Sequence, residues 1–447
     1  MSILGSLQYN KVEITPTNGG SALDLTSSID FIDYFEDLLS PAVTALIRIT
    51  ANYSIFNLVP IRGGEKVEID LDAASGKFKM TGNYALYVYK VSNLVTDAQK
   101  ESFTLHLCSR ETLTNETARV QKKYNKSPIS DHVKSILNDV LLTNKYKDEN
   151  IENTSNSYTF IGTQKKPFHI LTWLCPKGIP ATSGGSSGTS SGGGGSSRTG
   201  SGGKGLEEVN AKGVSGYLFY GTIGGFNFRS IDSLVSKTKS QVGSTDNENI
   251  PKYTLSSVIQ GGTVESAMTI LNYTFEKNID LIRSLRLGMY SNYTYFYNLY
   301  NDKYTGIKYS IANELNSKLG KNPIPYPQDF GNKATRVMVR LSDTGTLDPN
   351  KSTAESGRDD SDMAKSFARY NLLFTQSLNM MVPCNLNLKA GGIVNIQFPK
   401  INPSQQTIVD PDMETSGLYL IREVRHHFEG GQMVTALKLV RDSYGLY

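Results

Sequence analysis

The chain has 447 residues, too many for one compact core of the usual size of roughly 100 to 200 residues, so we expect two or more folding units. Hydrophobic residues make up 38% of the chain and charged residues 20%, a balance that excludes a largely disordered protein. The formal net charge of +4 is spread without a basic block, which argues against sequence-specific binding of nucleic acid. The 25 tyrosines favour strands and contact surfaces over helical bundles.

The cysteines and the apolar runs limit the cellular setting. Cys108, Cys175 and Cys384 are too widely spaced for a zinc site or a disulfide framework, which indicates buried thiols in a reducing compartment. No metal and no cofactor is predicted. No apolar run approaches the roughly 20 residues that cross a bilayer, and residues 1–10 lack a signal-peptide pattern. We therefore expect neither stable membrane insertion nor secretion by the usual signal.

Residues 1–109 are predicted to form a first antiparallel β-barrel. Val67, Ile69 and Leu71 alternate with charged residues, which is the pattern of a strand with one buried face. The same period of two recurs at residues 103–108, and glycines between such runs indicate turns. Several short strands separated by turns favour a barrel or a sandwich.

Residues 110–215 change to helical periodicity and are predicted to form a mixed insert domain. A first helix is expected to take Ser130 as its N-cap, because apolar residues follow it at helical spacing. A second helix is expected to carry Pro167 in its first turn and Trp173 in its core-facing side. Residues 183–205 contain 11 Gly and 8 Ser, a composition typical of a flexible linker.

The remaining residues are predicted to form a second antiparallel barrel from 216–236 and 335–447, with 237–334 as another insert domain. A strand pair and a short helix capped by Ser230 are expected within the first of these segments. Two alternating runs within residues 419–441 flank a Gly-Gly pair, as in a β-hairpin. Strands therefore dominate both ends of the chain.

Several segments resemble the baseplate central hub proteins of contractile-tailed phages. The most specific is FYGTIGGFNFRSIDSL at residues 219–234, which is similar to the sequence that enters the second tube-like barrel of those hubs. Residues 368–399 and 416–445 agree with later strands and with the closing hairpin of such a barrel, and residues 31–71 are similar to the opening of the first barrel. The hub portions of secretion-system spike proteins share this plan.

The resemblance implies an α+β, mainly β subunit with two tail-tube-like antiparallel β-barrels and smaller α/β insert domains. Three subunits would form a pseudo-hexameric ring that adapts the six-fold tail tube to the three-fold spike. The implied partners are two further copies of the chain, the spike protein, the tail tube protein and baseplate wedge proteins. The implied role is structural and not enzymatic: a hub in the virion tail baseplate, assembled in the host cytoplasm, that forms a conduit for DNA ejection.

The candidate interface or structural residues lie in the segments that carry the resemblance. Arg229 and Asp232 have two interpretations, a bridge to a neighbouring subunit or spike, and a local ion pair or cap. Phe228 and Leu234 are assigned to the packing of the short helix on the second barrel. Glycine and proline residues in these segments set turns. The full set is Phe228, Arg229, Ser230, Asp232, Leu234, Pro383, Gly391, Tyr419 and His426.

No catalytic or metal-binding set is predicted. His426 and His427 are neighbours on an expected strand, so they point to opposite faces and do not chelate one ion together. The acidic cluster of Asp359, Asp360 and Asp362 lacks the glycine and the closing glutamate of a calcium loop.

The Tyr-rich region from 290 to 304 supports an alternative from another class. It suits half-buried strands or a contact surface, and a carbohydrate-binding or cell-wall-degrading tail component is the alternative function. Such a component needs an aromatic platform or a pair of carboxylates in an open groove. The sequence selects no such pair.

Overall fold

The computed structural model describes residues 7–181, 216–235, 250–255, 267–276, 280–299, 302–310, 319–320, 333–342, 353–400 and 411–445, apart from residues 74, 98 and 431. The linker predicted at residues 183–205 lies outside these residues. Among the helices so described, none has the length and apolarity needed to cross a membrane.

The first part of the chain folds into antiparallel strands and one short helix. Val67, Ile69 and Leu71 are fully buried, while the charged residues between them stay partly exposed. The strand predicted there is confirmed, and so is the strand predicted at residues 103–108. The elements are β1 (Gln8–Thr15), β2 (Leu23–Asp24), β3 (Ile29–Asp37), β4 (Thr44–Ala51), α1 (Ile55–Leu58), β5 (Lys66–Ala73), β6 (Gly76–Met80), β7 (Leu86–Thr96) and β8 (Glu101–Ser109).

The last part of the chain supplies four strands, and two more reach them from earlier in the sequence. The predicted closing hairpin is confirmed, because Phe428 pairs with Met433 and Glu429 with Gln432. Two of these strands come from residues 237–334, the segment predicted as an insert domain. The six are β13 (Lys252–Thr254), β14 (Asn272–Glu276), β18 (Gln376–Pro383), β19 (Ile393–Gln397), β20 (Gly417–Glu429) and β21 (Gln432–Arg441).

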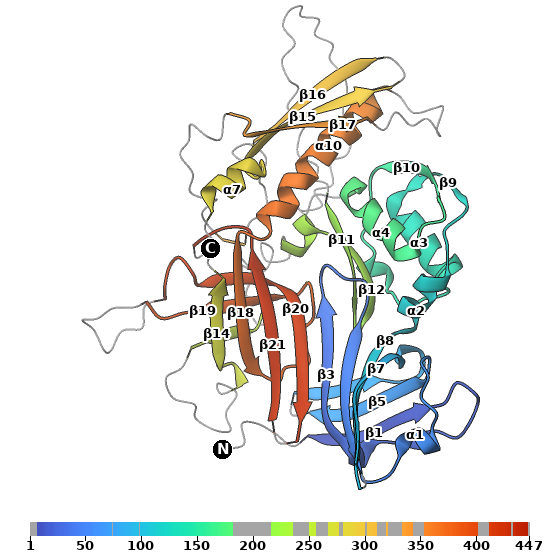
Figure 1. The fold of residues 1–447 in the computed structure, drawn as a ribbon. Helices are drawn as coiled ribbons and strands as arrows, with labels where there is room; N and C mark the ends of the chain where they lie inside the picture. Colours follow the sequence, from blue (N-terminus) through green and yellow to red (C-terminus); the bar gives the residue numbers. More distant parts are fainter. Residues whose placement is uncertain are drawn as a thin grey trace, which may run out of the picture.

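One 14-stranded sheet joins the two parts (Figure 1). Its order is β14-β18-β21-β20-β3-β4-β8-β7-β5-β1-β2, with β6, β13 and β19 paired beside this path. Strands β3 and β20 form the seam between the parts, with Asp37 opposite Glu423 at one end and Phe31 opposite Glu429 at the other. The predicted mainly β class is confirmed. The two predicted barrels are not confirmed, because within the described residues the strands of the large sheet form an open path and no closed barrel.

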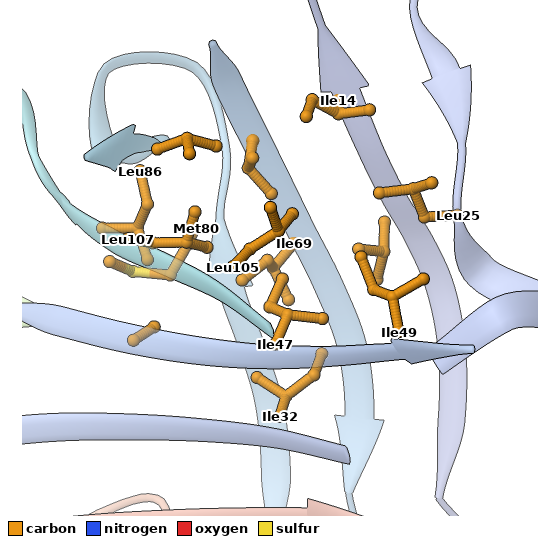
Figure 2. Close-up of a cluster of buried hydrophobic side chains, with 14 of the residues drawn as sticks. Ile14, Leu25, Ile32, Ile47, Ile49, Ile69, Met80, Leu86, Leu105 and Leu107 are labelled. Atoms are coloured by element: carbon orange, nitrogen blue, oxygen red, sulfur yellow. The ribbon is translucent and has the colours of Figure 1, made fainter. Parts of the chain in front are cut away.

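Two hydrophobic cores pack against the sheet, one in each part. In the first core, Ile47 and Leu105 lie among other aliphatic side chains that point toward one another (Figure 2). Phe428 and Met433, at the tip of the β20–β21 hairpin, complete this core from the far end of the sequence. Each such buried side chain stabilises the fold by roughly 1.5–3 kcal/mol. The second core includes Leu378, Val394, Ile396, Tyr419 and Leu439.

The insert after β8 is a small helical body with a two-stranded sheet. The helix predicted to begin near Pro167 is confirmed. The N-cap prediction for Ser130 is wrong: Pro128 is the cap, and the Ser130 hydroxyl instead accepts a hydrogen bond from the Thr154 amide. The core prediction for Trp173 is also wrong, because 39% of it is exposed at the edge of an aromatic cluster. The elements are α2 (Arg110–Thr117), β9 (Lys123–Pro128), α3 (Ile129–Asp139), β10 (Ser157–Ile161) and α4 (Pro167–Leu174).

Strands β11 (Tyr217–Thr222) and β12 (Gly225–Ser230) form the predicted strand pair but stand outside the large sheet. Both faces of the hairpin are apolar. Phe219 packs in the cluster of the insert, whereas Leu218 packs in a cluster with residues of β20 and β21. A strand with two buried faces has no side to show to solvent. The hairpin therefore fills the space between the insert and the large sheet.

The third body is a three-stranded sheet with a helix on one face (Figure 1). It comprises α7 (Leu281–Arg286), β15 (Ser291–Asn298), β16 (Lys303–Ser310), β17 (Arg336–Leu341) and the long helix α10 (Thr353–Leu372). Strand β15 is central, antiparallel to β16 and parallel to β17. The acidic cluster at residues 359–362 falls within α10.

Candidate functional site

The segment with the strongest resemblance, residues 219–234, lies between the insert and the large sheet. Phe228 stacks on Tyr217, with ring centroids 4.4 Å apart, and belongs to the hydrophobic cluster of the insert. Leu234 packs in another cluster, with Leu420 of β20. Phe228 thus differs from the prediction that it packs on the second barrel. The reason is that alternate side chains of a strand point to opposite faces.

Ser230 directly precedes a short helix over residues 231–235. Its hydroxyl oxygen accepts a hydrogen bond from the Ser233 amide at 3.1 Å, which is the geometry of an N-cap. The carboxylate of Glu152, from the insert, accepts from the Ser230 amide at 2.8 Å and from the Ser230 hydroxyl at 2.9 Å. A negative charge at a helix N-terminus is favourable. The cap therefore also ties the insert to the segment that follows β12.

Arg229 and Asp232 both have partners within the chain. Arg229 donates to the backbone oxygen of Glu149 at 3.0 Å. Asp232 accepts from Nε of Arg369, in α10, at 3.0 Å. Both contacts lie within the chain and agree with the interpretation of a local ion pair or cap. They connect the segment after β12 to the insert on one side and to α10 on the other.

A buried ion network around Arg369 was not predicted from the sequence. Arg369 is only 2% exposed, and its Nη1 donates to Asp442 at 2.8 Å. Burial alone would lower the pKa of Arg369, but Asp232 and Asp442 outweigh it and raise that pKa, so the guanidinium stays charged. The other Asp442 oxygen accepts from the Leu319 amide at 2.8 Å. The network thus joins α10 to the residues after β21.

Gly391 and Pro383 matter for the path of the backbone and not for side-chain chemistry. Gly391 has φ of +80°, and a side chain there would collide with the Tyr220 hydroxyl of β11. Its amide donates to the Ile421 oxygen at 2.9 Å, which holds the loop against β20. Pro383 is the last residue of β18, opposite Val434 of β21. Both residues shape connections of the second part of the large sheet.

Tyr419 and His426 lie on β20 with buried side chains. The Tyr419 hydroxyl donates to the Thr415 oxygen at 2.6 Å, and the Arg441 guanidinium lies 5.2 Å from the Tyr419 ring centre. Nδ1 of His426 lies 2.9 Å from the Thr435 hydroxyl on the neighbouring strand. His427 points to the other face of the sheet, so the prediction that the two histidines diverge is confirmed.

Acidification is expected to destabilise the protein through His426. Burial lowers the pKa of His426 from 6.5 to about 4. The unfolded chain takes up this proton near pH 6.5 and the folded chain only near pH 4, so the contribution is complete above pH 6.5 and is lost as the pH falls toward 4. The loss amounts to roughly 3 kcal/mol. Urea unfolding at pH 7 and pH 4.5 measures this loss. The free energy of unfolding of His426→Asn should change less between the two pH values than that of the unaltered protein. An equal change in both proteins would contradict the role of His426.

A charged cluster crosses the seam between β3 and β20. Asp33 is buried and accepts two hydrogen bonds from Arg425, from Nε at 3.0 Å and Nη2 at 2.8 Å. Nδ1 of His427 lies 2.7 Å from the same carboxylate, and its Nε2 lies 3.3 Å from Glu429. The hydrogen bond to Asp33 raises the pKa of His427. Charge-assisted contacts therefore reinforce the backbone pairing that joins the two parts.

An open groove of about 760 Å³ runs across the same seam. Its walls come from both parts of the large sheet and carry charges of both signs, with Asp37 and Glu423 near Arg425 and Lys438. Among the described residues, no group of three or more His, Cys, Asp or Glu side chains is placed to hold a metal ion. The predictions of no metal and no cofactor remain predictions.

The nine candidate residues thus gather in two places. Phe228, Arg229, Ser230, Asp232 and Leu234 surround the junction of the insert, α10 and the large sheet. The others lie on or beside the strands of the second part: Pro383, Gly391, Tyr419 and His426. Glu152, Arg369 and Asp442 complete the first group but carry no local sequence signal.

Comparison with known proteins gives matches among solved structures only; no family model and no curated protein matches the chain. A tail protein from Neisseria meningitidis MC58 is 10% identical, with a TM-score of 0.51, over 98% of this chain and 97% of its own. The 43 kDa tail protein of prophage MuSo2 from Shewanella oneidensis is also 10% identical, with a TM-score of 0.50, over 97% of this chain and 99% of its own. The chain shares the fold of these tail proteins. The predicted resemblance to tail hub proteins is therefore confirmed at the level of the fold.

Proposed function

We propose that this chain is the baseplate hub of a contractile phage tail, with a structural and not a catalytic role. The observation that carries the proposal is the fold shared, over nearly the whole chain, with two tail proteins, one of which comes from a prophage. The interior of the described chain supports it too. The candidate residues hold bodies of the chain together through caps, ion pairs and close packing.

We further propose that the chain contains two tube-like units, 1–109 and 216–236 with 335–447, and that each unit contributes strands to one part of the large sheet. Each part of the sheet has its own core, although Phe428 and Met433 of the second unit also pack in the first core. Of the two inserts, 110–215 then lies outside the large sheet, whereas 237–334 contributes strands β13 and β14 to it. Three copies supply six similar units, which allows a three-fold ring to match a six-fold tube on one side and a three-fold spike on the other.

In this proposal the hub contacts the spike protein, the tail tube protein and baseplate wedge proteins in the virion, after assembly in the host cytoplasm. The ring encloses a conduit for DNA ejection.

The proposal is tested by the mass and shape of the purified protein, alone and with its spike partner. Light scattering is expected to give three times the 49.2 kDa of one chain. Negative-stain images down the main axis are expected to show a ring with six similar lobes. A stable monomer that forms no ring even with the spike would overturn the proposal.

The alternative of a carbohydrate-binding or cell-wall-degrading component has weaker support. The tyrosines at the β15–β16 sheet are tilted, by 49° between Tyr293 and Tyr295 and by 33° between Tyr297 and Tyr304. Aliphatic side chains of β17, not hydrogen-bonding groups, continue this surface. Such a surface favours contact with protein over contact with sugar. A glycan-binding screen and a peptidoglycan zymogram check this alternative.

A further inference from the structure

The side chain of His427 joins strand β20 to strand β3 at the seam of the large sheet. His427 lies directly opposite Asp33 in the pairing of the two strands. Nδ1 of His427 lies 2.7 Å from the Asp33 carboxylate, and Nε2 lies 3.3 Å from the carboxylate of Glu429, two residues further along β20. Each nitrogen of the imidazole ring therefore faces a carboxylate.

Only one protonation state of His427 suits both contacts. A neutral imidazole carries one N–H group and one bare nitrogen, whereas an imidazolium carries two N–H groups. An ionised carboxylate accepts hydrogen bonds and cannot donate them. A neutral His427 would turn a lone pair toward one of its two carboxylates, so the geometry favours the protonated ring.

The charged groups closest to His427 agree with a protonated ring. Burial would raise the pKa of Asp33, but hydrogen bonds from His427 and Arg425 outweigh it and lower that pKa, so Asp33 stays ionised. The hydrogen bond to Asp33 raises the pKa of His427, burial opposes it, and the contact with Glu429 raises it further. The positive charge of Arg425 has the smallest influence on His427. The two carboxylates therefore outweigh the neighbouring cation.

The other strands packed around His427 do not supply a competing charge, among the residues that the structure describes. On β1, burial and then Glu429 raise the pKa of Tyr9 to about 12, so its hydroxyl stays neutral. On β21, the residue opposite His427 is Val434. On β4, Arg48 shares the face of His427 but donates to side-chain hydroxyls of β8.

We propose that His427 is a pH-sensitive switch that holds the β20–β21 hairpin against β3 while the ring is protonated and loosens it when the proton is lost. The contribution of His427 to stability is complete below pH 6.5, the ordinary pKa of an unfolded chain, and is lost as the pH rises through the higher pKa of the folded chain. Phe428 and Met433, which complete the first core, lie at the same end of this hairpin. The inference does not rest on the proposed function, which assigns no response to pH.

The neighbouring His426 responds to pH in the opposite direction. It lies on the other face of β20, where burial lowers its pKa to about 4, so the folded chain holds it neutral. Acid therefore weakens the packing of β20 on one face, and alkali weakens the contact of β20 with β3 on the other. Strand β20 is held most firmly in a pH range that is bounded at both ends.

Hydrogen exchange of the full chain, followed by mass spectrometry at pH 6 and pH 8.5, tests the switch. Each rate is divided by the rate of an unstructured peptide at the same pH, because exchange itself accelerates with pH. The expected result is a loss of protection from pH 6 to pH 8.5 in segments 29–37 and 423–429, and no loss in α3 of the insert. In His427→Gln the protection of both segments is expected to change little, because an amide side chain does not titrate.

The matched control is His169→Gln, which removes an exposed histidine of α4 and should keep the full loss of protection. Glu429→Gln is a second variant, at a site whose side chain is 54% exposed, that serves if His427→Gln does not fold. The new amide can donate to the bare nitrogen of a neutral His427, so the loss between the two pH values should be smaller than in the unaltered protein. No loss in the unaltered protein, or an equal loss in either His427→Gln or Glu429→Gln, overturns the inference.

Discussion

Replacing Arg369 by alanine is expected to lower the free energy of unfolding by about 3–5 kcal/mol. The substitution leaves Asp442, which is fully buried, without its cationic partner, and it removes the contact of Asp232 with α10. An uncompensated buried charge costs far more than a lost surface ion pair. Urea unfolding followed by far-UV circular dichroism at pH 7 measures the change.

A matched control is Arg422→Ala. Arg422 forms an ion pair with Glu423 at 3.1 Å in a partly exposed setting. Its loss is expected to cost about 1 kcal/mol or less. Arg369→Lys keeps the charge but loses the planar fork that reaches two carboxylates, so an intermediate loss is expected. Equal effects of Arg369→Ala and Arg422→Ala would show that the network does not stabilise the fold.

Replacing Glu36 by alanine is expected to lower the free energy of unfolding by about 3–5 kcal/mol, because it leaves three donors, two of them buried, without this acceptor. Glu36 accepts from the Tyr34 hydroxyl at 2.9 Å, the Ile223 amide at 2.6 Å and the Ala390 amide at 2.9 Å. These donors lie on β3, in the turn between β11 and β12, and in the loop before β19. One carboxylate on β3 therefore fixes two loops from the rest of the chain.

Hydrogen exchange gives this prediction a local readout. In Glu36→Ala the amides of Ile223 and Ala390 are expected to lose protection. The control Glu423→Ala removes a partly exposed carboxylate and should leave both amides protected. Glu36→Gln retains one acceptor oxygen and should lose less stability than Glu36→Ala. Unchanged exchange at both amides in Glu36→Ala would show that Glu36 does not fix the two loops.

Strands with a regular local pattern were predictable from the sequence. Alternation at residues 66–71 identified β5, and two alternating runs around a Gly-Gly pair identified the β20–β21 hairpin. Strand β13 was missed because it is three residues long and pairs in parallel with β19, more than a hundred residues later. No local pattern reports such a partner. The prediction that Trp173 is buried was wrong, because its helix has apolar residues on several sides and the sequence alone does not show which side faces the core.

In the candidate site too, contacts between sequence neighbours were predictable and contacts between distant residues were not. The Ser230 cap depends on neighbours within three residues, so the sequence predicted it correctly. The contacts of Ser230 with Glu152, of Asp232 with Arg369 and of Arg369 with Asp442 span 78, 137 and 73 residues. Charged residues of these types are common on surfaces, and only the fold reveals which ones are buried together.

The seam between β3 and β20 also constrains the order in which the chain matures during synthesis. Strand β3 is made early, but its neighbour β20 and the side chains of Phe428 and Met433 leave the ribosome nearly four hundred residues later. Until then, the first core lacks one wall and β3 presents an unpaired edge, the type of edge that recruits other chains. The nascent protein thus depends on its last hairpin to complete its first core, and a fragment that ends before β20 is expected to aggregate.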